Sequence, residues 1–88
     1  MTNVQLRAVM IHHLNNFNDE GVEVTEDTLH QEVLSDNDGF GAANSKSLYK
    51  GVIRWTLARN GHEDPDWPSK WMEMSVRDLA GALIPATA

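Results

Sequence analysis

The sequence contains no cysteine, which excludes disulfides and zinc sites built on thiolates. A chain without cysteine is typical of a reducing compartment. The sequence also lacks any run of about 18 apolar residues that could cross a bilayer. Its N-terminus has no basic stretch followed by a continuous apolar segment, as a secretory signal would have. These absences predict a protein with no membrane association, in the cytoplasm of a bacterial or virus-infected cell.

Motifs of catalysis and of metal binding are absent as well. There is no P-loop and no Gly-x-Gly-x-x-Gly, and no nucleophile or pair of carboxylates stands beside a candidate base. The segment "SDNDGFG" resembles a calcium loop, but aligning Gly39 with the invariant glycine puts Ser45 where a carboxylate ligand is needed. His12 and His13 are adjacent, so a helix would point them about 100° apart. We therefore expect no enzyme activity, no cofactor and no metal.

The length of 88 residues predicts a single small domain, residues 1–88, with one hydrophobic core. An apolar content of 41% and three tryptophans are sufficient for such a core. Apolar spacing and capping residues predict an all-α fold. The expected helices cover about residues 3–17, 25–35, 45–60 and 75–84. The alternating residues 22–24, "VEV", predict a short strand before the second helix.

Charge is distributed unevenly along the chain. The formal net charge is −6, from thirteen acidic and seven basic residues. Residues 19–38 contain eight acids and no Lys or Arg, whereas residues 46–59 contain four bases and no acid. Such separation indicates two candidate binding surfaces, although either could also be an ordinary solvated surface. Opposite patches would also favour head-to-tail self-association.

The basic segment is "NSKSLYKGVIRWTLARNG", residues 44–61, which is predicted to be an amphipathic helix. Asn44 or Ser45 is a good N-cap, and Gly61 follows the expected end. A helical wheel places one group of apolar side chains on one face and basic side chains on another. The apolar group contains Leu48, Tyr49, Val52, Ile53 and Trp55.

The segments "VTEDTLHQEVL" and "SKSLYKGVIRWTLARNG" resemble a helix-turn-helix of the winged-helix type, over about residues 4–61. The resemblance implies that the third helix enters the major groove of DNA. It implies that Leu48, Val52 and Trp55 pack against the first and second helices. It also implies DNA contacts from Ser45, Lys46, Ser47, Lys50 and Arg54. Lys46 and Lys50 would bind phosphates, and Ser47 and Arg54 would reach phosphates or base edges. Since about three or four phosphate contacts give weak binding, a homodimer is expected.

The acidic segment supports an alternative hypothesis, in which the chain is a small inhibitor or adaptor that binds a basic protein. In size and charge it resembles nuclease immunity proteins and phage-encoded inhibitors. Electrostatic steering and a few apolar anchors would supply the binding. The candidate contacts are Glu23, Glu26, Asp27, Glu32, Asp36 and Asp38, with Trp67 and Trp71 as exposed anchors. Nucleic-acid binding by a small regulatory protein is the leading hypothesis, and this inhibitor is the alternative.

Overall fold

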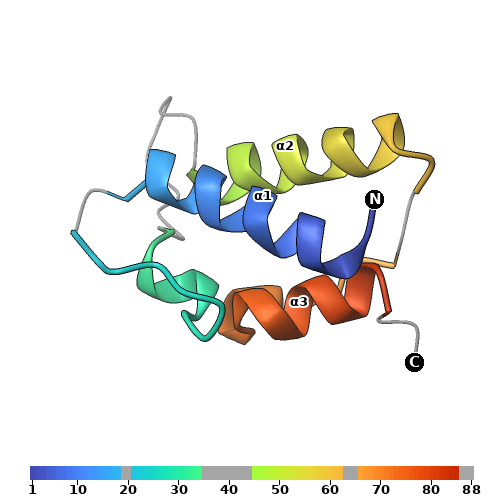
Figure 1. The fold of residues 1–88 in the computed structure, drawn as a ribbon. Coiled ribbons are helices and arrows are strands. Elements are labelled where there is room, and N and C mark those ends of the chain that lie inside the picture. Colours follow the sequence, from blue (N-terminus) through green and yellow to red (C-terminus); the bar gives the residue numbers. More distant parts are fainter. Residues whose placement is uncertain (19–20, 35–44, 63–65, 86–88) are drawn as a thin grey trace.

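The computed structural model describes residues 1–18, 21–34, 45–62 and 66–85. This part of the chain is mostly helical, with three α-helices: α1 (Asn3–Asn16), α2 (Ser45–Arg59) and α3 (Val76–Leu83). Two single-turn 3₁₀ helices, η1 (His30–Glu32) and η2 (Trp71–Glu73), lie between them in the sequence. Helix α1 packs against both α2 and α3, which lie on either side of it in Figure 1. None of the helices described is both long and apolar enough to cross a membrane.

Helix α1 begins at a capping box and buries one stripe of side chains. The Thr2 hydroxyl accepts a hydrogen bond from the Gln5 backbone N–H (3.1 Å), and the Gln5 side chain accepts one from the Thr2 N–H (2.8 Å). Leu6, Met10 and Leu14 recur every four residues and are fully buried. The first helix is therefore confirmed, and its apolar stripe faces the core as expected.

Helix α3 also begins at a capping residue and buries one stripe of apolar side chains, over a shorter length. The Ser75 hydroxyl accepts a hydrogen bond from the Asp78 N–H (3.1 Å), which caps the helix. Val76, Leu79 and Leu83 are buried against the rest of the core. At the far end, the Asn3 side chain of α1 donates to the Ile84 carbonyl (2.8 Å) and ties the two helices together. The last predicted helix is confirmed to within a residue at each end.

The predicted helix at about 25–35 is wrong over its described part, residues 25–34. These residues form a turn followed by η1. Their backbone groups pair with a distant segment: the His30 N–H donates to the Met74 carbonyl (3.1 Å), and the Val76 N–H donates to the Thr28 carbonyl (3.1 Å). Leu29 and Ser75 form an isolated antiparallel bridge. Over residues 26–30, hydrogen bonds to residues 74–77 thus take the place of helical hydrogen bonds.

The predicted strand at 22–24 is also wrong. No strand is found among the described residues, and the Leu29–Ser75 bridge is an isolated pair. The Val22 N–H donates to the Asn18 side chain (3.1 Å), whose amide donates back to the Val22 carbonyl. Because this side chain satisfies the backbone of Val22, the chain turns at Gly21 without a partner strand. A winged-helix arrangement would need the second helix and the strand, and the described residues contain neither.

Candidate binding surface on helix α2

Helix α2 buries one part of its predicted apolar face and exposes another. Tyr49, Ile53 and Leu57, which recur every four residues, are fully buried. Leu48 and Trp55 are instead 46% and 59% exposed, so the prediction that they pack against the other helices is wrong. At 100° per residue, the centres of these two groups lie nearly opposite each other around the helix. Helix α2 thus has apolar side chains on its inner and its outer side.

A buried hydrogen bond accounts for this orientation of α2. The Tyr49 hydroxyl lies 3.0 Å from Nε2 of His30, and Nδ1 of His30 lies 2.8 Å from the Met74 carbonyl. A carbonyl only accepts, so Nδ1 carries the proton and Nε2 accepts from Tyr49. Burial lowers the pKa of His30 and raises that of Tyr49, which keeps both groups neutral. Turning Leu48 inward would take the Tyr49 hydroxyl away from this partner.

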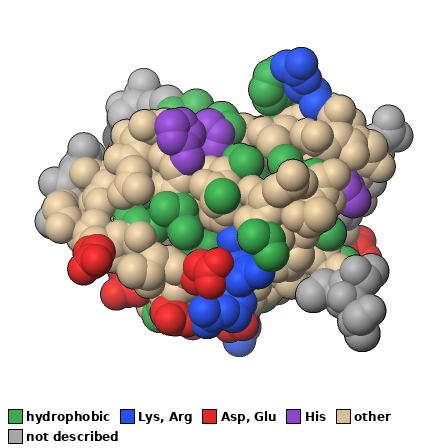
Figure 2. All heavy atoms as spheres, in the orientation of Figure 1, with side chains coloured by type: hydrophobic (Ala, Val, Ile, Leu, Met, Phe, Trp, Pro, Cys, Tyr) green, Lys and Arg blue, Asp and Glu red, His purple; other side chains and the backbone are tan. Residues whose placement is uncertain are grey.

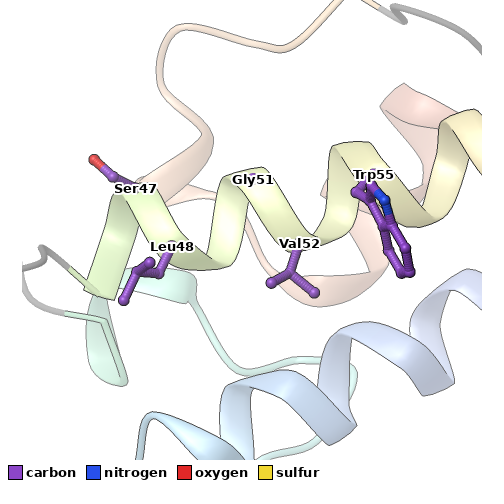
Figure 3. A pocket seen from close by; sticks show the side chains of 5 residues that line it. All are labelled: Ser47, Leu48, Gly51, Val52 and Trp55. Carbon is purple, nitrogen blue, oxygen red and sulfur yellow. The ribbon is translucent and has the colours of Figure 1, made fainter.

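The outer side of α2 carries a shallow hollow of about 420 Å³. We call it the α2 groove and define it by the residues that line it: Ser47, Leu48, Gly51, Val52 and Trp55. In Figure 3 the side chains of Leu48, Val52 and Trp55 lie along one side of the helix, and Ser47 points away from them. A Cβ added at Gly51 would meet nothing within 4 Å, so the backbone there is open to an approaching molecule.

An arginine borders this groove. The guanidinium carbon of Arg59 lies 4.6 Å from the centre of the Trp55 ring, in cation–π contact. Figure 2 shows a basic side chain beside a hydrophobic one, projecting from the edge of the molecule along α2. Arg59 was not among the contacts predicted from the sequence. The i, i+4 spacing of Trp55 and Arg59 was the signal that could have identified it.

The five predicted DNA contacts differ in their exposure to solvent. Ser47 and Arg54 are exposed, whereas Ser45, Lys46 and Lys50 are half-buried. Nζ of Lys50 lies 5.6 Å from the centre of the Trp67 ring, so its charge is held against the body of the protein. Ser45, Lys46 and Arg54 also make interactions within the molecule. Lys46, Lys50 and Arg54 recur every four residues and so follow one side of α2, whereas Arg59 lies on another side, beside Trp55.

Two of the predicted acidic contacts are paired inside the molecule. Glu26 lies between Arg7 of α1 (Nη1–Oε1, 3.0 Å) and Arg77 of α3 (Nη2–Oε2, 3.1 Å), and Asp27 also pairs with Arg77. These contacts raise the pKa of Arg77, mainly through its hydrogen bond to Asp27. The four residues hold the 21–29 segment between α1 and α3. We call them the carboxylate clamp.

The other acidic candidates differ in their surroundings. Glu23 is exposed. The carboxylate of Glu32 accepts a hydrogen bond from the Leu29 N–H (2.6 Å) and so caps η1. Asp36 and Asp38 lie outside the described residues. Of the described acidic candidates, Glu26, Asp27 and Glu32 thus have partners within the molecule.

The tryptophans predicted as exposed anchors are packed. Trp71 is 3% exposed and stacks on Tyr49 with ring centres 5.9 Å apart, so its assignment as an exposed anchor is wrong. Trp67 is half-buried and meets Trp71 edge to face at 5.4 Å. Trp55 is the exposed tryptophan of the three. The aromatic anchor available to a partner therefore lies on α2.

Within residues 1–18, 21–34, 45–62 and 66–85, no group of three or more His, Asp or Glu side chains is placed to hold a metal ion. His12 and His13 lie edge to face with ring centres 5.1 Å apart.

No protein-family model, curated protein or solved structure matches this chain. The functional proposal therefore rests on the geometry of α2.

Proposed function

We propose that this protein is a small binding protein that docks on a protein partner through the α2 groove. The observation that carries the proposal is the exposure of Leu48 and Trp55 on a helix whose opposite side is fixed in the core. Tryptophan is enriched among the residues that dominate binding energy, because it buries a large apolar area with little loss of conformational freedom. An apolar ridge next to an exposed glycine backbone offers a surface against which another protein can pack.

The size of the groove sets the strength expected of this contact. From Leu48 to Trp55 the helix rises only about 10 Å, whereas a standard interface buries roughly 800 Å² on each partner. Leu48, Val52 and Trp55 together offer a part of that area. We therefore expect the partner to extend over the borders of α2 as well, or to bind transiently with micromolar affinity.

Nucleic-acid binding through the same helix is the second candidate. Its supporting observation is that α2 carries four of the seven Lys and Arg residues and no acid, with Ser47 and Arg54 exposed. Such a surface would contact phosphates more than base edges. With about three phosphate contacts, the logarithm of affinity would fall with the logarithm of salt at a slope near −3.

Selection of displayed helical peptides on the immobilised protein would test the first candidate. Peptides would be counter-selected on the double variant Leu48→Ser/Trp55→Ser, and Val4→Ser serves as a matched control because Val4 is 62% exposed on α1. We expect peptides that bind the wild type and the Val4 variant, and that lose about tenfold or more in affinity for the double variant. Circular dichroism would establish that all three proteins keep the same helical content.

A defined result of the same selection would contradict this proposal. A selection that yields no peptide dependent on Leu48 and Trp55 would overturn protein docking at the α2 groove. If a labelled random-sequence duplex then bound at about 50 mM salt, weakened at about 200 mM and failed with Arg54→Gln, nucleic-acid binding would replace it.

A further inference from the structure

We propose that the occupant of the α2 groove is an amphipathic helix whose apolar stripe is bordered by carboxylates. This inference rests on the proposed protein-binding function and names the chemistry of the partner. It is carried by two independent features of α2, namely the shape of its outer side and the sign of the charges around it.

The shape of the outer side favours a helix as the occupant. Leu48, Val52 and Trp55 are spaced i, i+4 and i+7, which makes a ridge of the kind that interdigitates with the side chains of a second helix. Gly51 lies beside this ridge and presents no side chain, so the axis of an incoming helix can come close. An added β-strand would need a free sheet edge, and the described residues contain no named strand to offer one.

The charges around the groove favour acidic borders on that helix. Helix α2 contains no acidic residue, and Arg59 is its basic residue beside the groove, whereas Lys46 and Lys50 lie on the opposite side of the helix at 100° per residue. Arg59 lies over the face of Trp55, and a guanidinium stacked in this way can still donate its in-plane N–H groups. Those donors suit a carboxylate, which can accept two parallel hydrogen bonds from one guanidinium. A Glu or Asp beside the apolar stripe would therefore meet Arg59 at the end of the groove.

The rest of the molecule would orient such a partner. The whole chain has a formal charge of −6, and the exposed surface away from α2 includes Glu23 and Glu32. An acidic helix is repelled by the net negative charge of the molecule and attracted to Arg59, so its charge favours docking at this end of α2. A second copy of this chain fits less well, because pairing two α2 grooves would bring no carboxylate of α2 to either Arg59.

Three synthetic peptides of about 18 residues would test the inference. They share one Leu/Phe stripe and differ in carrying Glu, Gln or Lys at its borders. Labelled peptides are titrated with the full chain by fluorescence anisotropy at about 50 and 200 mM salt. We expect the Glu peptide to bind about tenfold or more tightly than the Lys peptide, with the difference shrinking at the higher salt.

Substitution of Arg59 separates charge from apolar contact. Arg59→Gln should weaken binding of the Glu peptide and leave the Gln peptide unchanged. Lys70→Gln, which removes one positive charge from the exposed residue that precedes η2, should leave both unchanged. Equal binding of the Glu and Lys peptides, lost in Leu48→Ser/Trp55→Ser, would overturn the acidic partner and leave protein docking at α2 intact. Failure of all three peptides would overturn the amphipathic-helix inference, and the displayed-peptide selection would decide separately whether α2 docks a protein at all.

Discussion

The hydroxyl of Tyr49 on α2 lies 3.0 Å from Nε2 of His30 in η1, and both side chains are fully buried. The other ring nitrogen of His30 donates to the Met74 carbonyl next to η2. One neutral imidazole thus connects three elements that are far apart in the sequence. This hydrogen bond also determines which side of α2 faces solvent, because the side chains of Leu48 and Trp55 point outward when Tyr49 points into the core.

Tyr49→Phe tests this connection most directly. The substitution keeps the ring and its stacking on Trp71 but leaves Nε2 of His30 buried without a donor. We expect the free energy of unfolding to fall by about 1–3 kcal/mol, measured by urea denaturation. The double variant His30→Leu/Tyr49→Phe should lose less than the sum of its single variants, because it removes both partners. A Tyr49→Phe protein as stable as the wild type would show that the hydroxyl does not satisfy His30.

Acidification should destabilise the protein through His30. Burial lowers the pKa of this imidazole from its ordinary value of 6.5, against a smaller opposing effect of the hydrogen bond to Met74. As the pH falls below about 6.5, the unfolded chain takes up the proton before the folded one does. The stability present above pH 6.5 is therefore lost progressively toward the folded pKa, with a slope of up to about 1.4 kcal/mol per pH unit.

Urea denaturation at pH 7.5, 6.5 and 5.5 would measure this slope. His30→Gln should flatten it. The pKa of His13 is also lowered, by partial burial and by the neighbouring His12, so His13→Gln is the matched control. We expect His13→Gln to flatten the slope less, because His13 is half-exposed whereas His30 is fully buried. If the dependence of the free energy of unfolding on pH were unchanged in the His30→Gln variant, His30 would not be its cause.

Truncating a side chain on the buried side of α2 should lower the free energy of unfolding, whereas truncating one on the exposed side should hardly change it. Leu57 is fully buried, so Leu57→Ala should lower the free energy of unfolding by about 2–5 kcal/mol. Leu48 is 46% exposed, so Leu48→Ser should change it by no more than about 0.5 kcal/mol. Thermal and urea denaturation of the two variants would give both values. A large loss with Leu48→Ser and a small one with Leu57→Ala would place α2 the other way round.

The helices that the sequence predicted well are those whose start signals act locally. Thr2 and Ser75 each cap the helix that follows them, and the side chains buried by α1 recur every four residues. Thr25, Glu26 and Asp27 look like an equally good helix start. Their segment instead makes backbone hydrogen bonds with residues 74–77, about fifty positions away in the sequence. Pairing over such a distance leaves no local pattern, so propensity alone predicted a helix there.

The candidate site was predicted only in part for a related reason. The position of α2 and its basic character were predicted from the sequence. Two sets of apolar side chains recur at helical spacing on α2, however, and periodicity alone does not tell which of them faces the core. The choice depends on a hydrogen bond from Tyr49 to His30, nineteen residues earlier. Once that choice is made, Trp55 is exposed and Arg59 lies beside it. Trp71 is inside for the same reason, since it stacks on the buried Tyr49.

The carboxylate clamp gives the last prediction. Arg7 has a largely buried side chain, 19% exposed, and its carboxylate partner is Glu26. Glu26→Gln should therefore lower the free energy of unfolding by about 1 kcal/mol, whereas Asp27→Asn should cost less because Asp27 is 75% exposed. Urea denaturation at about 0.1 and 1 M salt would compare the variants, and screening should reduce the difference between them. Equal losses would mean that Arg7 does not depend on Glu26. If the clamp holds, a loss of partner binding on substitution of Glu26 or Asp27 would report a loosened fold, and Glu23 is the exposed acid at which a direct acidic contact should be tested.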